Sequence, residues 1–366
     1  MITKKANLPH VLNNLLFKKN EPVSLVHFVT NRCNARCSFC FIDFDNPDTF
    51  KAELTLEEID NFTKNLGKSL LNVNLTGGEP FARKDLIDIA NLYIKNTTIQ
   101  SLYITTNASL PDRVEKFVDE VQKMDNELEL TFQISIDDKP AEHDRVRKIK
   151  GLFDKCMDTY KLLQNKQDNV SPMVSITVTH ENCDRIEDIF NYLYYDCSIR
   201  SLKCTIVRDE GVYKTPLEKR KKILDAYNFL TNKIQKYCEE GKMIGYNEKS
   251  LQGRLHKRKD FISWKLVKEM YLKPKYISPC HSGSLFGIIT AKGDVYPCEI
   301  LEDKLLGNLR NNNYDFIKIW KNDKTQDVKK FIKKTKCNCT YECALTYNIL
   351  GNYRYYPKLV SEMFNL

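Results

Sequence analysis

Six short runs rich in apolar and β-branched residues recur along the first two thirds of the chain, with helical spacing between them. The runs lie at 23–30, 71–76, 101–106, 128–136, 173–179 and 201–207. The helical segments lie at 55–67, 84–95, 111–124, 151–165, 184–195 and 216–239. Strands that alternate with helices over short connections favour a parallel sheet covered by helices. The pattern fits an open doubly wound sheet, a closed barrel or a partial barrel, and does not choose among them.

The composition and periodicity of the sequence change after about residue 240, which suggests that the chain is divided into units. We interpret 1–22 as an N-terminal extension and 23–240 as the core domain. A charged, poorly periodic stretch at 241–279, with some helix in "DFISWKLVKEMYL", is expected to be a connector. Residues 280–366 carry cysteines and turn signals and are predicted to form a second, smaller unit.

The cysteine content indicates metal or cluster binding. The chain has 13 cysteines in 366 residues, and no apolar run is long enough to span a membrane. Lys18 and Lys19 follow the short apolar stretch near the start, with no small-residue cleavage site. We therefore expect a cytoplasmic protein without a membrane partner, and a reducing compartment argues against a disulfide framework.

The positive charge of the chain is spread over several clusters. Lys and Arg number 57 against 48 Asp and Glu, a net charge of +9, with basic clusters at 218–222, 254–259 and 329–336. Lysine-rich helix faces are usually solvated, and no nucleic-acid motif accompanies these clusters. We expect no nucleic-acid partner.

Three cysteines follow the first predicted strand in "TNRCNARCSFCF". Cys33, Cys37 and Cys40 form a C-x3-C-x2-C pattern, and thiolates suit iron-sulfur clusters or zinc. Three thiolates leave one iron of a four-iron cluster open, as a catalytic cluster requires. The alternative is a structural zinc site with a distant fourth ligand.

A second motif, "TGGEP", follows the second predicted strand. Gly77 and Gly78 expose backbone carbonyls beside the carboxylate of Glu79, and such a site can receive an ammonium group. A Gly-Gly pair is also a common strand-to-helix turn.

Together these two motifs resemble those of the radical S-adenosylmethionine (SAM) superfamily. The resemblance implies a partial (β/α)6 TIM-like barrel and a 4Fe-4S cluster on the three cysteines, whose open iron binds S-adenosylmethionine. It further implies that Phe39 lies near the adenine and that Gly77, Gly78 and Glu79 bind the methionine amino group. Reductive cleavage of the cofactor would yield a 5′-deoxyadenosyl radical, which abstracts a substrate hydrogen.

The stretch "SIDDKPAEHDRVR" after the fourth strand resembles a pattern of the subgroup with extra clusters, with somewhat different spacing. The resemblance places Ser135 and Asp137 at ribose or methionine contacts. Arg145 or Arg147 could pair with the methionine carboxylate through a bidentate fork, or belong to an ordinary basic loop.

The C-terminal unit resembles the SPASM and Twitch auxiliary-cluster domains, through "CHSGSLFGIITAKGDVYPC" and the late "CNCTYEC". Five thiols, fewer than a full SPASM domain uses, favour one auxiliary 4Fe-4S cluster. Cys280 and Cys298 would be joined by two of three others, and we favour Cys339 and Cys343, with Cys337 nearby or substituting. Zinc remains the alternative. The other cysteines have no paired spacing and are predicted to be small buried residues: Cys156, Cys183, Cys197, Cys204 and Cys238.

Fold and cofactor do not specify the substrate. One hypothesis is an oxidoreductase that oxidises or rearranges a small molecule, sugar-like or nucleotide-linked, with electrons from a flavodoxin- or ferredoxin-type reductant. Another is a maturase that crosslinks, epimerises or forms thioethers in a ribosomally made peptide. The 22 residues before the first strand are too few for a leader-binding module, so we prefer the small molecule. A third is a non-enzymatic iron-sulfur or zinc protein. No residue is assigned to the hydrogen transfer itself.

Overall fold

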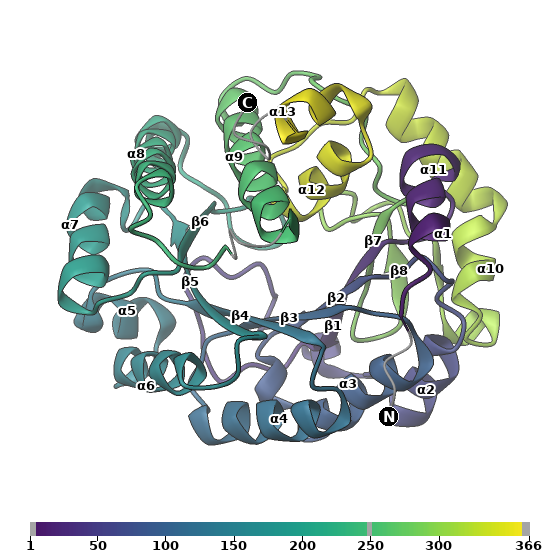
Figure 1. The fold of residues 1–366 in the computed structure, drawn as a ribbon, viewed down its shortest axis with the longest axis horizontal. Helices are drawn as coiled ribbons and strands as arrows, with labels where there is room; N and C mark the ends of the chain where they lie inside the picture. The colour runs from purple at the N-terminus through teal and green to yellow at the C-terminus, as the bar shows by residue number, and fades with distance from the viewer. Residues whose placement is uncertain (1–4, 247–250, 361–366) are drawn as a thin grey trace.

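The computed structural model describes residues 5–246 and 251–360, and within them it contains one nine-stranded sheet (Figure 1). The strand order is β6-β5-β4-β3-β2-β1-β7-β8-β9. The first six strands pair in parallel with their neighbours, which confirms the predicted parallel sheet. The strands are β1 (Ser24–Thr30), β2 (Asn72–Gly77), β3 (Ser101–Thr106), β4 (Glu129–Ser135), β5 (Val170–Val178), β6 (Leu202–Ile206), β7 (Phe286–Ile289), β8 (Asp294–Tyr296) and β9 (Gly307–Asn308).

Helices follow the strands of the parallel part and cover its outer face, as Figure 1 shows for α3, α4 and α6. The predicted capping box at Thr55 and Glu58 is present at the start of α2. The α-helices are α1 (Leu8–Asn13), α2 (Leu56–Thr63), α3 (Leu86–Asn96), α4 (Pro111–Met124), α5 (Pro140–Arg147), α6 (Leu152–Gln164), α7 (Ile186–Asn191), α8 (Arg220–Glu239), α9 (Leu251–Tyr271), α10 (Phe316–Lys321), α11 (Asp323–Lys334), α12 (Glu342–Leu350) and α13 (Tyr356–Val360). Short turns of 3-10 or π-helix and irregular loops connect these elements.

The two faces of the strands have different chemistry. Side chains such as Ile104 and Phe132 point outward into the main apolar core under the helices. The opposite, inner face is polar along β3 to β6, where the Tyr103 hydroxyl donates to Gln133 Oε1 at 2.7 Å and Lys203 lies on β6. On β1 and β7 the inner face is apolar and forms a second cluster, which includes Phe28. The inner space of the sheet therefore has a polar half and an apolar half.

The C-terminal unit continues the sheet of the core. β7 pairs in parallel with β1, with Ser24 opposite Phe286, and β8 and β9 follow in antiparallel order. The predicted smaller unit is thus joined to the core by backbone hydrogen bonds. α9, α12 and α13 lie across the sheet from α3 and α4 and cover its inner side (Figure 1).

Two helices differ from the sequence-based expectations. The connector at 241–279, for which some helix is expected at 260–272, contains the longer helix α9 of 21 residues, and the loop after β4 contains α5. Both helices turn polar side chains inward, Asp260 from α9 and His143 with Arg147 from α5. α9 also buries an apolar stripe that includes Trp264 and Val267, whereas the buried face of α5 is mainly polar and gives no apolar periodic signal.

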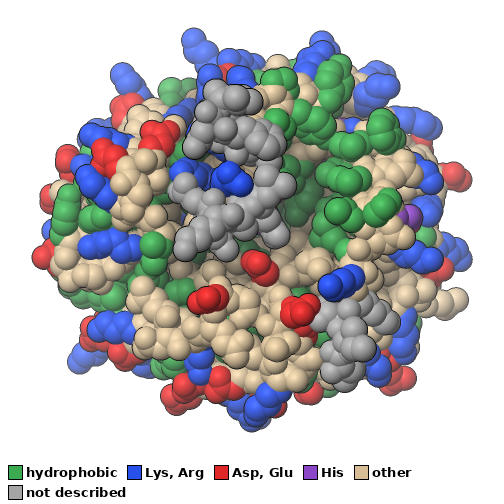
Figure 2. Space-filling model, in the orientation of Figure 1, with side chains coloured by type: hydrophobic (Ala, Val, Ile, Leu, Met, Phe, Trp, Pro, Cys, Tyr) green, Lys and Arg blue, Asp and Glu red, His purple; other side chains and the backbone are tan. Residues whose placement is uncertain are grey.

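The surface shows no concentration of basic side chains on the face in Figure 2, where Lys and Arg are spread around the rim among Asp and Glu. Among the described residues, no helix is both long and apolar enough to cross a lipid bilayer.

Candidate active site

Three thiols lie on the segment 31–44 that follows β1, which we call the cysteine loop. Cys33, Cys37 and Cys40 are all partly buried there. The backbone N–H of Ala35 donates to the sulfur of Cys33 at 3.3 Å, and the Asn107 side-chain amide lies 3.8 Å from the same sulfur. N–H donors to a thiolate sulfur tune an iron-sulfur cluster.

The cysteine loop is held against α5 by backbone hydrogen bonds. The N–H of Arg36 donates to the carbonyl of Arg147 at 3.1 Å, and that of Ser38 donates to Val146 at 3.2 Å. The Ser38 hydroxyl also contacts the carboxylate of Glu181, which follows β5. Segments that follow β4 and β5 therefore fix the loop at the carboxyl edge of the sheet, where parallel α/β folds gather their active sites.

Arg147 is the central cation of this edge. Its Nε and Nη2 atoms contact Asp137 Oδ2 at 2.8 and 2.7 Å, and both side chains are almost fully buried. The guanidinium carbon lies 5.8 Å from the ring centroid of Phe39. Burial raises the pKa of the Cys37 thiol, and the charge of Arg147 opposes that rise.

The two glycines of the "TGGEP" motif pack against the backbone of the cysteine loop. Gly77 has φ +150°, and a Cβ there would lie 2.0 Å from the carbonyl oxygen of Thr30. A Cβ on Gly78 would lie 2.3 Å from the carbonyl oxygen of Arg32. The N–H of Gly78 donates to Thr30 at 2.8 Å. Glycine is therefore required for close backbone approach here, in addition to any role toward a ligand.

Glu79 is completely buried, and its carboxylate already accepts hydrogen bonds from the protein. It accepts hydrogen bonds from the Thr106 hydroxyl at 2.7 Å, from the N–H of Asn107 at 2.7 Å and from the N–H of Phe81 at 3.1 Å. Burial raises the pKa of Glu79 to about 7, although these donors oppose the rise. The carboxylate thus ties the end of β2 to the end of β3.

Of the two arginines expected near the cofactor, Arg147 is buried and Arg145 is not. Arg145 has 57% of its side chain exposed and pairs with Glu142 at 2.8 Å and Glu181 at 3.1 Å. Ser135 is the last residue of β4, on the inner face. The structure thus brings Phe39, Ser135, Asp137 and both arginines to the same edge as the cysteine loop.

The donor set of this edge fits an iron-sulfur cluster. Burial raises the pKa of Cys33 to about 12 and also raises that of Cys40. Bound iron would supply the positive charge that keeps buried thiolates deprotonated. Within residues 5–246 and 251–360, no three His, Cys, Asp or Glu side chains are grouped tightly enough to hold a single metal ion. A four-iron cluster spreads its thiolates more widely than one ion does.

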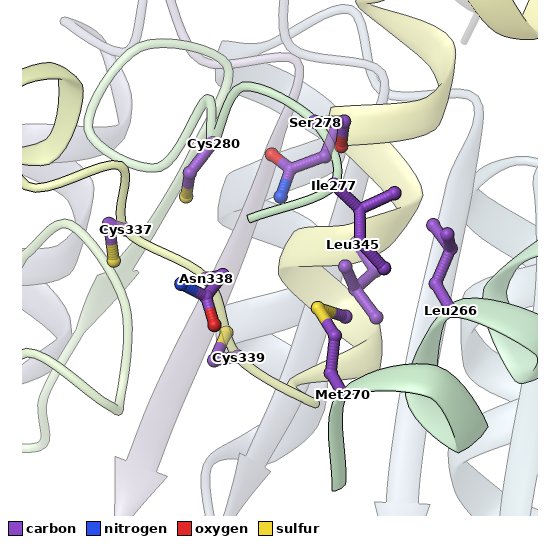
Figure 3. A pocket seen from close by; sticks show the side chains of 10 residues that line it. Leu266, Met270, Ile277, Ser278, Cys280, Cys337, Asn338, Cys339 and Leu345 are labelled. Atoms are coloured by element: carbon purple, nitrogen blue, oxygen red, sulfur yellow. The ribbon is translucent and has the colours of Figure 1, made fainter. Parts of the chain in front are cut away.

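A second group of thiols lies between α9, α12 and the start of β7. Cys280, Cys337 and Cys339 line one small pocket, and Figure 3 shows Cys280 and Cys337 facing the same space. The thiols of Cys280 and Cys337 are hydrogen-bonded, which lowers the pKa of Cys280 and raises that of Cys337. Met270 and Leu345 form part of the apolar lining.

Cys298 and Cys343 complete the five late cysteines but differ in their surroundings. Cys298 is buried, and the charge of Cys280 adds to the rise in its pKa. Neither Cys298 nor Cys343 lines the pocket of Figure 3, but the charges that act most on Cys343 are those of Arg208 and Lys203 and not that of Cys280. We call Cys280, Cys298, Cys337 and Cys339 the C-terminal cysteine group.

Several residues of this region carried no signal that a sequence could reveal. Asn107 follows β3 in "TTNAS" and Glu181 follows β5, and only the position after a strand could have suggested them.

Four of the five cysteines without paired spacing are buried, as predicted, and Cys197 is partly buried.

Comparison with known proteins identifies two domains. A model described as the radical SAM superfamily matches residues 28–193, and one described as SPASM, an iron-sulfur cluster-binding domain, matches residues 280–344. A radical SAM domain carries a 4Fe-4S cluster and S-adenosylmethionine, and a SPASM domain carries auxiliary iron-sulfur clusters. These matches confirm the cofactors expected from the sequence.

Two relatives are similar over part of the chain. The sporulation killing factor maturation protein SkfB of Bacillus subtilis (strain 168) is 28% identical over 172 residues, which span 46% of this chain and 38% of SkfB. The GTP 3',8-cyclase of Clostridium perfringens (strain SM101 / Type A) is 29% identical over 173 residues, 45% of this chain and 50% of the cyclase. The chain thus spans half or less of these two relatives.

A solved structure is similar over nearly the whole chain. Native anSMEcpe with bound AdoMet has a TM-score of 0.61 at 16% identity, and the match covers 94% of this chain and all of that one (100%). This similarity confirms the fold, a partial barrel of the radical SAM type with a C-terminal SPASM domain.

Proposed function

Because the chain belongs to the radical SAM superfamily and ends in a SPASM domain, we propose that it removes a hydrogen atom from a small polar molecule. The observation that carries this proposal is the placement of the cysteine loop. Its three thiols lie at the carboxyl edge of the parallel sheet, with the glycines of "TGGEP" packed on one side and buried Arg147 on another. The inner face of the strands that end at this edge is polar from β3 to β6.

We assign the three thiols of the cysteine loop as the ligands of the catalytic cluster. The carbonyls of Gly77 and Gly78 are assigned to the methionine ammonium group, because the Glu79 carboxylate already accepts three hydrogen bonds. When bound, the reduced cluster and S-adenosylmethionine supply a 5′-deoxyadenosyl radical, while the protein orients and shields the reacting groups.

Arg145 is the better candidate for the methionine carboxylate. Arg147 is held by both its Nε and Nη2 atoms on Asp137 in a buried pair, and releasing it would leave a buried carboxylate unpaired. The pairs of Arg145 are exposed and therefore weak, so this side chain can exchange partners at little cost. We assign Arg147 to holding Asp137 and to placing positive charge near the thiols.

The polar half of the inner space supports a small polar substrate. Lys203 lies on this inner face of β6, and its ammonium pairs with Asp260 Oδ1 at 3.7 Å. Asp260 is already engaged by Lys259 at 2.5 Å and by the Tyr246 hydroxyl at 2.7 Å. The ammonium of Lys203 therefore retains donors for a hydroxyl, carboxylate or phosphate oxygen of the substrate.

For the SPASM domain we propose one auxiliary 4Fe-4S cluster held by the C-terminal cysteine group. Cys337 takes the place that the sequence assigned to Cys343, because it shares a hydrogen bond with Cys280 and lines the same pocket. Met270 and Leu345 would shield this cluster from water on one side.

A peptide substrate is the second candidate, supported by the name of SkfB as a maturation protein and by a further structure of native anSMEcpe with bound AdoMet and Kp18Cys peptide. The name of the GTP cyclase supports a small molecule instead. Incubation with deuterated small molecules and with deuterated peptides separates the two. Label that appears in 5′-deoxyadenosine identifies the class and the hydrogen taken.

The test of the enzyme assignment is formation of 5′-deoxyadenosine by the reconstituted, anaerobically reduced protein. We expect product from the wild type and none above background from Cys37→Ala. A wild type that gives no more product than Cys37→Ala would leave only the non-enzymatic hypothesis. Iron analysis is expected to give about eight irons per chain for two four-iron clusters.

A further inference from the structure

Arg208 lies between the two groups of thiols. It follows β6 by two residues, at the carboxyl edge of the sheet. Its side chain is 29% exposed and contacts residues that are 167 and 91 positions away along the sequence, Phe41 and Glu299. Each of these residues directly follows a cysteine, Cys40 or Cys298.

On the side of the cysteine loop, Arg208 fixes the residue after Cys40. Its guanidinium carbon lies 5.2 Å from the ring centroid of Phe41, within cation–π range. The Phe41 ring meets Phe28 of β1 edge to face at 6.0 Å. Gly211 brings the same segment against the loop, since a Cβ there would lie 2.3 Å from the carbonyl oxygen of Phe41.

On the C-terminal side, Arg208 contacts two residues that adjoin the C-terminal cysteine group. Its Nη1 atom pairs with the carboxylate of Glu299, which is 14% exposed. The guanidinium carbon also lies 5.2 Å from the ring centroid of Tyr341, which stands between Cys339 and Cys343. The Tyr341 hydroxyl donates to Glu299 Oε1 at 2.6 Å, so the three side chains form one connected unit.

We propose that Arg208 is a positioning residue shared by both iron-sulfur sites, which fixes Phe41 beside one cluster and Glu299 with Tyr341 beside the other. The inference rests on the proposed function only in requiring a cluster at each site. A guanidinium cannot be deprotonated in the protein, so it provides a permanent positive charge to both sites. Because reduction adds negative charge to a cluster, a nearby cation favours the reduced form.

The experiment uses two full-length proteins that each keep one cluster. Cys337→Ala with Cys339→Ala leaves the cluster of the cysteine loop, and Cys33→Ala with Cys37→Ala leaves the auxiliary cluster. Arg208→Met is introduced into each, and the midpoint potential is measured by redox titration followed by electron paramagnetic resonance. We expect the reduced fraction at a fixed potential to fall about tenfold in both proteins, a shift of about 59 mV for a one-electron couple.

The matched control is Arg310→Met. Arg310 also joins the C-terminal unit to the core, through Glu58 at 2.5 Å and the carbonyl of Ala52 at 3.0 Å, but at α2. We expect Arg310→Met to leave both potentials unchanged. Equal shifts from the two substitutions would overturn the proposal, because they would mark a general effect of loosening the contact between the units.

A second variant separates the effect of the positive charge from the effect of the planar guanidinium group. Arg208→Lys keeps the charge but loses the planar fork, and we expect it to restore most of the potential while the resonance spectrum of each cluster stays altered. If neither Arg208→Met nor Arg208→Lys changes the potential or the spectrum at either site, Arg208 is an ordinary ion pair and the inference is wrong. Formation of 5′-deoxyadenosine tests the proposed function separately, since the potentials are measured without S-adenosylmethionine.

Discussion

The two groups of thiols in this protein are assembled in different ways. Cys33, Cys37 and Cys40 lie on one loop of 14 residues, 31–44, after the first strand, so their spacing in the sequence almost determines their spacing in space. The C-terminal cysteine group draws on segments separated by β7, β8, β9 and two helices. The local motif therefore indicates its whole ligand set from the sequence, whereas the sequence left open which of three late cysteines join Cys280 and Cys298.

The two groups of thiols also differ in the residues that surround them. The cysteine loop borders a buried ion pair and N–H donors to sulfur. The C-terminal pocket is lined in part by Met270 and Leu345 and is bounded by helices. The first region is suited to binding a polar cofactor and substrate, and the second to enclosing a group that stays in place.

The largest difference between the regions is expected in cofactor cleavage. Cys40→Ala should reduce 5′-deoxyadenosine formation to the background, a loss of at least about 10³-fold, or about 4 kcal/mol. Cys339→Ala should leave cleavage in the absence of substrate measurable, because it affects only the second site. The product is quantified chromatographically under anaerobic, reducing conditions. If Cys339→Ala abolishes cleavage as completely as Cys40→Ala does, the two sites are not separate in function.

The second prediction concerns the ligands of the C-terminal site, where sequence and structure favour different residues. Cys337→Ala should lose about four irons per chain, since Cys337 faces Cys280 in the pocket. Cys343→Ala should keep them, because the charges that act most on Cys343 are those of Arg208 and Lys203, whereas Cys280 acts on Cys298 and Cys339. Iron content of the reconstituted proteins decides between the two. Loss of iron in Cys343→Ala alone would restore the assignment made from the sequence.

Much of the parallel sheet could be predicted because its strands and helices carry apolar periodicity. The predicted strand at 101–106 coincides with β3, and the predicted helix at 111–124 coincides with α4. The strands β7 to β9 escaped prediction because they are short, with two to four residues each. The pairing of β7 with β1 joins residues more than 250 positions apart.

The candidate site was only partly predictable for a related reason. Residues within motifs, such as Cys33 or Gly78, could be named from spacing. Asn107 and Arg208 act through contacts with distant segments, so their positions along the sequence carry no pattern. The sequence also assigned Glu79 to ligand binding, while in the fold its carboxylate is engaged by the ends of two strands.

The third prediction compares the buried ion pair of the first region with an exposed surface pair. Arg147→Met leaves Asp137 buried without its cation, and we expect the free energy of unfolding to fall by about 3–5 kcal/mol. Arg145→Met should change it by less than about 1 kcal/mol, since that side chain is largely exposed. Denaturant titrations of the two variants measure both values. Similar values for the two variants would show that the buried pair of Arg147 and Asp137 stabilises the fold no more than the exposed pairs of Arg145 do.

The smallest effect is expected where the C-terminal unit meets α2, through Arg310 and Glu58. Hydrogen bonds to its carboxylate, chiefly from Arg310 and also from the Thr55 N–H and the Tyr314 hydroxyl, lower the pKa of Glu58 from its usual value of 4.5 to about 2. A carboxyl whose pKa is lower in the folded state stabilises the fold above its unfolded pKa, and this contribution disappears as the pH falls toward the folded pKa.

Arg310→Met should therefore lower the free energy of unfolding by about 1 kcal/mol at pH 7, and the difference from the wild type should shrink as the pH falls from about 4.5 toward 2. Unfolding of both proteins at a series of pH values measures this trend, with Lys221→Met, an exposed lysine, as the control for a lost surface charge. A difference independent of pH would mean that Arg310 acts through its contacts with the carbonyls of Ala52 and Glu53, and that the junction of the two units does not depend on the charge of Glu58.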